Sequence, residues 1–370
     1  MRPAFSSTKQ AAAFALLLLV LLLLPVLSGK KILPPREQAY AAQSWGSGPF
    51  PWIRHEIFEE TGDVDIAFVG SSHIMHGVDT PYVQEKLGGK LGRPAVVRTV
   101  GWGGAGFDAL YFITRDLLEH RRVRLLVIYN ENNDVSVRNA QGPTWFRWSE
   151  DAAALAGLPW REEGLYYFTA MVGMPRNLLC RLRPNIPADL VSTPPNYWES
   201  HYHTARMVDS LGSSSSELGF NPSTLYDDYL PFVPFEPHTD ARAADVRIYP
   251  AATNGFEFSS LPLPAWQTHF ARKLVALARE HGCRLVLLHI PTMDEARSPV
   301  VTERKFWPEV LGAEGTILGI PPMKLFGGLT DEEVRKLYFN RSHLNKNGVE
   351  YFTPLITPAL LHIYDSPTNH

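Results

Sequence analysis

Cysteine is scarce in this sequence of 370 residues, which holds only Cys180 and Cys283. The two lie far apart and in no metal-ligand spacing, which excludes a zinc site built on thiolates. A single disulfide between them stays open as one interpretation, provided that the chain folds in an oxidising compartment. Cys283 also begins an apolar run that ends at Ile290, and we therefore favour a buried core thiol.

Long runs of basic residues are missing as well, and the formal net charge is −3. Because phosphate binding needs clustered Lys and Arg, nucleic acid is not expected as the main partner. His201 and His203 lie near no carboxylate pattern that would complete a metal site. We predict neither a metal nor an organic cofactor.

Charge is absent from the segment Ala11–Ser28, which is mostly leucine and follows Arg2 and Lys9. About 18 apolar residues are the lower limit for a membrane-spanning helix. A cleaved signal peptide and an uncleaved signal-anchor are the two interpretations, and Leu27-Ser28-Gly29 fits a cleavage site poorly. We expect residues 1–29 to form a transmembrane anchor with the body on the periplasmic or cell-surface side, or a secreted body if cleavage occurs.

Residues 30–62 are rich in Pro, Gly and Ser and are typical of a stalk or linker. From residue 63 onward, strands that are apolar throughout alternate with helices, the pattern of a parallel sheet covered on both faces. We therefore predict an α/β fold, a three-layer sandwich with a central parallel sheet. The strands are expected at 65–69, 95–100, 124–129 and 284–290, and the helices at 80–91, 107–120 and 264–281.

The alternation is lost between residues about 138 and 260, which contain many Pro, Trp and Tyr and the flexible segment Gly212–Ser216. Because the sheet needs both flanks to close, this stretch is interpreted as an insertion or cap within one domain spanning 63–370. A further strand is expected at 316–320.

Two helices are expected near the C-terminus. Thr330 and Glu333 form a capping-box pattern for the first, which should run to about Tyr338. A final helix from about Lys346 contains prolines and should be kinked or broken.

Polar or glycine-rich loops follow three of the predicted strands, at the sheet edge where parallel folds bind ligands. Gly70-Ser71-Ser72-His73 would place a serine hydroxyl at a helix N-terminus, although a helix N-cap explains a serine there equally well. Gly101–Gly106 would present backbone N–H groups to an oxyanion, or form a tight turn. Asn130–Asp134 would supply an amide donor, or turn residues.

Asn340-Arg341-Ser342-His343 precedes the last helix and completes the set. Imidazole is the usual base for a hydroxyl nucleophile, although a single histidine is more often structural. Taken together, a serine, backbone donors, an amide and a histidine at one sheet edge are the components of acyl transfer.

In the order of these blocks the chain resembles the SGNH (GDSL-like) hydrolase superfamily, over roughly residues 63–135 and 264–363. The resemblance implies an SGNH/flavodoxin-like fold and a serine site. The implied roles are nucleophile for Ser72, oxyanion donors for Gly104 (with Gly101 and Gly103 as rivals) and Asn133, base for His343, and orienting residue for Asn340.

The Gly-Ser-Ser variant and the predicted anchor look most like membrane-tethered members related to D-alanine transfer and polysaccharide O-acetylation proteins. This resemblance implies an esterase or acyltransferase acting on O-acyl groups of a cell-envelope or exported polysaccharide. The implied partners are an acylated glycan, the membrane and a membrane acyltransferase.

Three residues depart from the family pattern. Ser71 replaces an aspartate that matters little in the tethered branch, and Glu131 replaces a glycine. Asn340 stands where an aspartate should orient and charge-stabilise the histidine. A catalytically inactive scaffold or glycan-binding protein is therefore the alternative function. Phosphate-ester chemistry at the glycine loop lacks a lysine and metal carboxylates.

Other residues near the blocks offer substrate contacts. His76, one helical turn from Ser72, is an alternative base or a substrate contact, or a residue on the helix face. Trp102, with Trp145 and Trp148, would form a platform for sugar stacking, or pack in the core.

Overall fold

The computed structural model describes most of the chain, and the statements below concern that part alone. It divides into two compact units, one of residues 1–42 with 140–185 and one of 43–139 with 186–370, called here the N-terminal unit and the sheet unit. The described residues are 7–29, 35–41, 50–102, 106–129, 145–168, 170, 230, 233–237, 245–250, 264–297, 310 and 315–366.

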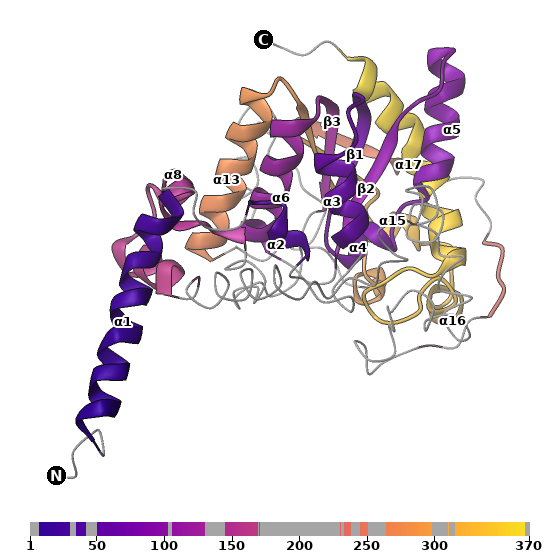
Figure 1. Ribbon diagram of the computed structural model, residues 1–370. Coiled ribbons are helices and arrows are strands. Elements are labelled where there is room, and N and C mark those ends of the chain that lie inside the picture. The colour runs from indigo at the N-terminus through magenta and orange to yellow at the C-terminus, as the bar shows by residue number, and fades with distance from the viewer. Residues whose placement is uncertain are drawn as a thin grey trace. The chain divides into compact units, whose positions relative to one another are not determined.

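The sheet unit is an α/β structure built on a six-stranded sheet of order β2-β1-β3-β5-β6-β4 (Figure 1). All neighbouring strands are parallel except β4, which pairs antiparallel with β6 at one edge. The predicted α/β class with a mostly parallel central sheet is thus confirmed. The strands are β1 (Val64–Gly70), β2 (Val97–Gly101), β3 (Val123–Tyr129), β4 (Arg247–Pro250), β5 (Arg284–Leu288) and β6 (Thr316–Gly319).

β1 lies inside the sheet, where all seven of its residues are buried. It pairs with β2 on one side and β3 on the other, so the chain order reverses direction at this strand. In doubly wound folds such a reversal opens a crevice beyond the carboxyl ends of the strands, where ligands bind. The residues that follow β1 and β3 therefore occupy the favoured position for a site.

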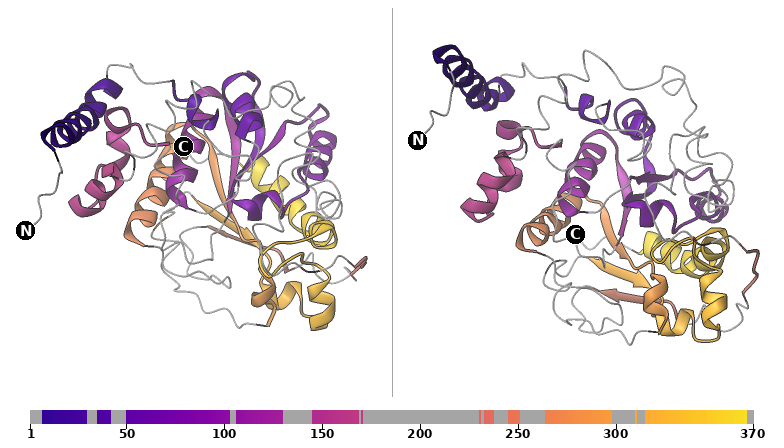
Figure 2. Two further views of the ribbon diagram at one scale, coloured as in Figure 1. Left: turned by 60° about the horizontal axis from the view of Figure 1, so that its bottom comes forward. Right: turned by 90° about the horizontal axis from the view of Figure 1, so that it is seen from below.

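Helices cover both faces of the sheet (Figure 2). On one face α6 (Phe107–His120) packs against α3 (Phe50–Phe58) and α13 (Ala265–Glu280). On the other face α5 (Thr80–Leu91) packs against α17 (Lys346–Asp365). The sheet is thus enclosed between two helical layers.

The core beneath α5 and α17 explains why the strands are apolar throughout. Ile66 and Phe68 of β1 share one buried cluster with Leu87 of α5 and with Ile356 and Leu360 of α17. Alternate residues of a strand point to opposite faces, so the residues between them meet the other helical layer. A strand buried on both faces needs apolar residues at every position, as the sequence has.

Local end signals start the helices where the sequence predicted, although the helix after Thr330 ends at Arg335 and not at about Tyr338. The Asp79 carboxylate accepts a hydrogen bond from the Tyr82 N–H and caps α5, which ends at Gly92 with φ of 64°. The Thr330 capping box forms at α16 (Asp331–Arg335), where the Glu333 carboxylate accepts from the Thr330 N–H at 2.7 Å.

The last helix was predicted to be kinked or broken, and of these alternatives the break is wrong. α17 continues as one helix of 20 residues through Pro354 and Pro358. Its buried side chains, among them Ile356 and Leu360, hold it against the sheet, and this packing outweighs the local cost of a proline.

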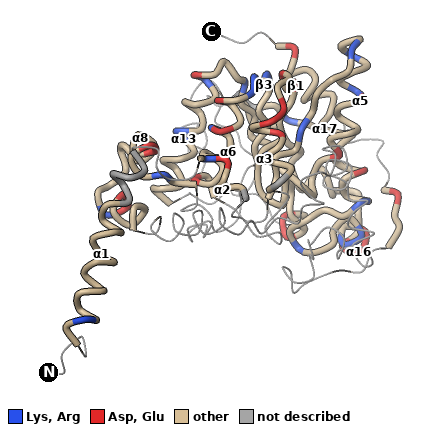
Figure 3. The backbone as a smooth tube through the Cα atoms, viewed as in Figure 1, with Lys and Arg blue, Asp and Glu red and all other residues tan. Residues whose placement is uncertain are grey.

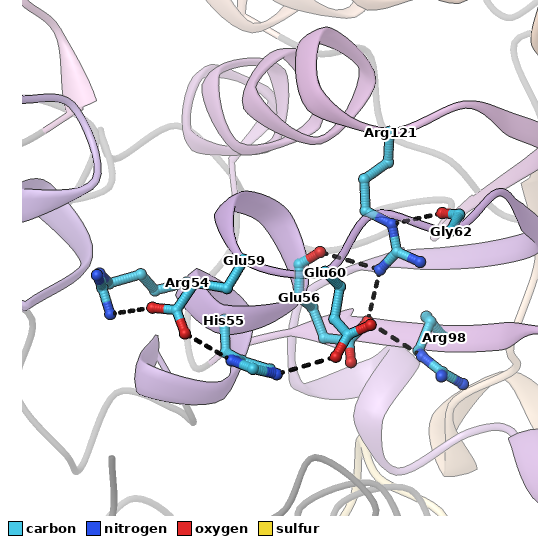
Figure 4. Close-up of polar contacts among 8 residues, drawn as sticks. All are labelled: Arg54, His55, Glu56, Glu59, Glu60, Gly62, Arg98 and Arg121. Atoms are coloured by element: carbon cyan, nitrogen blue, oxygen red, sulfur yellow. Dashed lines mark hydrogen bonds and ion pairs between the residues drawn. The ribbon is translucent and has the colours of Figure 1, made fainter. Parts of the chain in front are cut away.

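Within the sheet unit, a buried ion-pair cluster joins α3 to β2 and to the residue after α6 (Figure 4). The Glu56 side chain, 1% exposed, accepts hydrogen bonds from Arg98 Nε of β2 at 3.0 Å and from an Arg121 guanidinium nitrogen at 2.8 Å. Arg121 follows α6 and also donates to the backbone oxygens of Glu56 and Gly62. One carboxylate therefore joins a helix, a strand and a helix end.

The N-terminal unit contains α1 (Thr8–Gly29), α2 (Gln38–Ala41), η2 (Trp148–Glu150) and α8 (Ala152–Leu155). Within it, Arg36 forms a 3.0 Å ion pair with Asp151, and the rings of Tyr40 and Trp145 lie 4.5 Å apart. Figure 3 shows that α1 carries no charged residue beyond the lysine near its start, as the sequence predicted.

Among the described helices, none has both the length and the apolar content needed to cross a membrane. The transmembrane anchor expected over residues 1–29 is therefore not found.

The stretch between residues about 138 and 260 lies largely outside the described residues. Two of its described parts, η2 and α8, belong to the N-terminal unit. Another part forms β4, a strand that was not predicted from the sequence. It adds one edge strand to the sheet, next to β6.

Candidate active site

Ser72 is placed by a sharp turn between β1 and the short helix α4 (Ser72–Met75). At Gly70 a Cβ atom would approach Ile74 Cγ1 to 2.8 Å, so the close packing of α4 requires glycine. The Ser71 hydroxyl caps α4 by accepting a hydrogen bond from the His73 N–H. The N-cap interpretation thus applies to Ser71, and Ser72 has its hydroxyl left for another partner.

That partner is His343, whose Nε2 lies 2.8 Å from the Ser72 Oγ. The two residues are 271 positions apart in the chain, and both are buried. The structure therefore brings together the serine and the histidine that the sequence placed at one sheet edge.

The hydrogen bonds of Asn340 define the tautomer of His343. Asn340 Oδ1 accepts from the backbone N–H groups of Ser342 and His343, each at 2.9 Å, which identifies this atom as the oxygen. The same oxygen lies 2.9 Å from His343 Nδ1, which must then carry a proton. Nε2 is left with its lone pair toward Ser72, as a general base requires.

The loop that carries His343 is held rigidly. Tyr338 and Leu344 form an isolated antiparallel bridge, and the Phe339 N–H donates to the His343 carbonyl at 3.0 Å. The Asn345 amide donates to the Tyr338 carbonyl, and its oxygen caps α17. The Tyr338 hydroxyl donates at 2.6 Å to the Pro291 carbonyl in the loop after β5.

Three histidine rings meet at Ser72. The His73 ring stacks on that of His343 with centroids 4.5 Å apart, and on its other side stacks on Tyr129 at 4.6 Å. His76 meets His343 edge to face at 5.6 Å, and Phe339 lies against the same ring at 5.4 Å. His343 is thus enclosed by aromatic rings on several sides.

Burial keeps these histidines neutral. It lowers the pKa of His73 to about 3, with a smaller effect from His76, and it lowers the pKa of His76 to about 4. Burial also lowers the pKa of His343 well below its ordinary value, assisted by the two neighbouring histidines. A neutral His343 at pH 7 is the form that accepts a proton.

The predicted oxyanion donors are covered only in part. Gly104 and Asn133 lie outside the described residues, as do Gly103 and Glu131. At Gly101 a Cβ atom would come within 2.3 Å of Met75 Cγ, so packing against α4 explains that glycine. The oxyanion roles of Gly104 and Asn133 stay predictions.

The tryptophans expected as a sugar platform are all buried. Trp102, Trp145 and Trp148 are each 1% exposed, which agrees with the core-packing interpretation. Trp145 and Trp148 belong to the N-terminal unit, whereas Trp102 follows β2 in the sheet unit. Direct substrate contact by Trp102 or by the buried His76 stays a prediction.

Of the remaining candidate metal ligands, the structure describes only Cys283. Cys283 is a buried thiol, and burial raises its pKa to about 12. Its possible disulfide partner Cys180 lies outside the described residues, as do His201 and His203. Among the residues that the structure does describe, no three His, Cys, Asp or Glu side chains are placed to hold a metal ion.

Sequence reasoning missed the contribution of Tyr129, and it did not foresee that His73 would stack on His343. A signal for Tyr129 was present, because it ends the strand beside β1 and so lies at the same sheet edge as Ser72. The orientation of the rings depends on tertiary packing and has no counterpart in the sequence.

A cavity of about 550 Å³ lies at the opposite edge of the sheet, around the first residues of β1, β3 and β5. Arg93, Arg124 and Arg284 line it together with Asp65 and Asp365. Arg93 pairs with Asp65, and Arg284 donates to the backbone carbonyls of Ile363 and Ser366 at the C-terminal end of α17, so these groups hold the fold together. Its size does not make it the site, because Ser72 and His343 lie at the other edge.

Comparison of the chain with protein-family models and with curated proteins finds no match.

Proposed function

We propose that this protein is an SGNH-type serine esterase or acyltransferase. The observation that carries the proposal is the 2.8 Å contact between Ser72 Oγ and His343 Nε2, with His343 in the tautomer that accepts a proton. The position of Ser72 at the reversal point of the strand order supports the same function.

In the proposed reaction the Ser72 oxygen attacks the acyl carbonyl while His343 Nε2 takes the serine proton. The backbone N–H groups of Ser72 and Gly104 and the Asn133 amide hold the oxyanion of the tetrahedral intermediate. The intermediate collapses to an acyl-serine, and His343 returns its proton to the departing alcohol. Water or an acceptor hydroxyl then releases the acyl group by the reverse steps. No metal or organic cofactor takes part.

The proposed substrate is an O-acyl group on a cell-envelope or exported polysaccharide. The order of the Ser72, Gly104, Asn133 and His343 blocks, which resembles the membrane-tethered SGNH proteins, supports this class. A membrane acyltransferase that delivers or receives the acyl group is the proposed partner. Whether water or a glycan hydroxyl is the acceptor depends on that partner.

The body of the protein is proposed to act outside the cytoplasm. The support is the uncharged segment Ala11–Ser28 that follows Arg2 and Lys9, which is the pattern of an export signal. The side chains of Leu16 and Leu22 in α1 are exposed, which suits contact with a membrane surface.

Covalent labelling with a serine-reactive fluorophosphonate tests the nucleophile. Wild type should be labelled, Ser72→Ala should not be, and the matched control Ser71→Ala should keep the label because the Ser71 hydroxyl contacts His73 and not His343. Undiminished labelling of Ser72→Ala would refute the serine assignment.

A membrane-impermeant version of the label applied to intact cells tests whether the body of the protein lies outside the cytoplasm. Labelling only after lysis would contradict that location.

The alternative function is a non-catalytic envelope scaffold that binds a glycan. Asn340 favours it, because a neutral amide gives His343 an orientation but no stabilising charge. Turnover of p-nitrophenyl acetate by wild type and by His343→Ala separates the two. Wild-type turnover that falls with His343→Ala supports the enzyme, whereas equal rates for both proteins support the scaffold.

A further inference from the structure

The three stacked rings at the site come from three separate parts of the chain. Tyr129 ends β3, His73 lies in α4, and His343 lies in the loop before α17. The rings of Tyr129 and His73 are inclined by only 4°, and those of His73 and His343 by 22°. One face of the His343 ring is therefore covered by a ring that is itself backed by the sheet.

The proposed reaction places a positive charge on His343 when it takes the serine proton. The groups that contact its ring include Ser72, Asn340, His73, His76 and Phe339. None of these five is a carboxylate, so none supplies the charge that an aspartate provides in other serine sites. The face of a neutral aromatic ring is another kind of group that attracts a cation.

We propose that His73 is a positioning residue of the reaction, whose neutral ring, fixed between Tyr129 and His343, holds the catalytic imidazole in line with Ser72 and presents its π face to the developing imidazolium. This inference rests on the proposed function. Stacked aromatic pairs have a preferred geometry, and a cation is attracted to the face of a neutral ring.

The surroundings of His73 support a role as a neutral ring rather than as an acid or a base. Among the described residues, the polar or titratable groups that contact His73 or act on its charge are Ser71, Tyr129, His76 and His343. None of these four is a carboxylate. Its Nδ1 lies 3.4 Å from Ser71 Oγ, and its buried Nε2 has no hydrogen-bond partner in the described part of the chain. Burial lowers the pKa of His73 to about 3, so it carries no charge that would repel the imidazolium at neutral pH.

The experiment compares His73→Ala and His73→Phe with wild type, using p-nitrophenyl acetate as the probe. His73→Ala should lower kcat by about 2- to 10-fold, the rate equivalent of one lost aromatic contact, and leave KM unchanged. His73→Phe keeps a ring in the stack and should restore kcat. The control is His120→Ala. This histidine is the last residue of α6, and its loss should leave turnover unchanged. Equal kcat for wild type and His73→Ala, or no rescue by His73→Phe, would overturn the inference.

A second measurement keeps the inference separate from the proposed function. The ¹⁵N-imidazole NMR signals of His343 report whether Nδ1 is protonated and hydrogen-bonded, and they require no turnover. They should be retained in His73→Phe and broadened or shifted to mixed tautomers in His73→Ala. An ordered His343 ring in His73→Ala refutes the positioning role, whereas unaltered probe turnover by Ser72→Ala refutes the proposed function alone.

Discussion

Asn340 holds His343 by hydrogen bonding and supplies no negative charge. Its oxygen accepts three hydrogen bonds, two from backbone N–H groups and one from His343 Nδ1. Its buried amide nitrogen finds no partner among the residues that the structure describes. The residue thus orients the imidazole through Nδ1 while contributing no charge.

Asn340→Asp should raise the turnover of p-nitrophenyl acetate, by about tenfold or more. A carboxylate can accept the same three hydrogen bonds, and its negative charge stabilises the imidazolium. It also removes the buried amide donor. The reverse change, Asp to Asn, lowers kcat of a serine protease by about 10⁴-fold. The acid limb of the pH–rate profile should also move upward, because a negative charge raises the pKa of His343. Asn340→Leu is the matched control and should lower turnover. A rate for Asn340→Asp at or below that of wild type would favour the scaffold function.

At the residue scale, the sequence predicted that Ser72 and His343 would come together but not the side chains that surround them. Ser72 and His343 were predictable because a serine after a buried strand and a histidine before the last helix meet at one sheet edge. The stacking of His73 between Tyr129 and His343 was not predictable, since ring planes follow from side-chain packing across three elements.

Among the elements, those with local end signals were predicted best. α5 and α6 have the predicted bounds, and α5 owes its ends to Asp79 and Gly92. β4 was missed because it is four residues long, lies at the sheet edge and is defined by its pairing with β6. The continuity of α17 through its prolines likewise depends on tertiary burial, which local propensity does not contain.

α3 is attached to the rest of the sheet unit by the buried Glu56 carboxylate. Glu56→Ala leaves the buried Arg121 guanidinium without its carboxylate and should lower the free energy of unfolding by about 3–5 kcal/mol. Urea unfolding measures the change, and labelling of Ser72 under native conditions should persist because the cluster is remote from the site.

Glu59→Ala is the control for this cluster (Figure 4). The Glu59 side chain is 43% exposed and pairs with Arg54 and His55 at the surface, so its loss should cost less than about 1 kcal/mol. Equal costs for Glu56→Ala and Glu59→Ala would show that the buried cluster does not fasten α3.

For the whole molecule, buried neutral histidines couple stability to pH. Burial lowers the pKa values of His73 and His76 in the folded protein to about 3 and about 4, and it also lowers the pKa values of His289 and His343. In the unfolded chain these residues return to their ordinary value of 6.5. Between these values the unfolded state binds more protons than the folded state, so stability must fall as the pH falls.

The free energy of unfolding should therefore decrease from pH 7 to pH 5, with a contribution of about 2 kcal/mol from each of His73 and His76. The stability is present above pH 6.5 and is lost progressively as the pH approaches the folded-state pKa values of about 4 and about 3. Urea unfolding at several pH values measures this slope, and His76→Phe, which removes one titrating group, should reduce it by about 2 kcal/mol over the interval. An identical pH dependence in wild type and His76→Phe would contradict the lowered pKa of His76 in the folded protein.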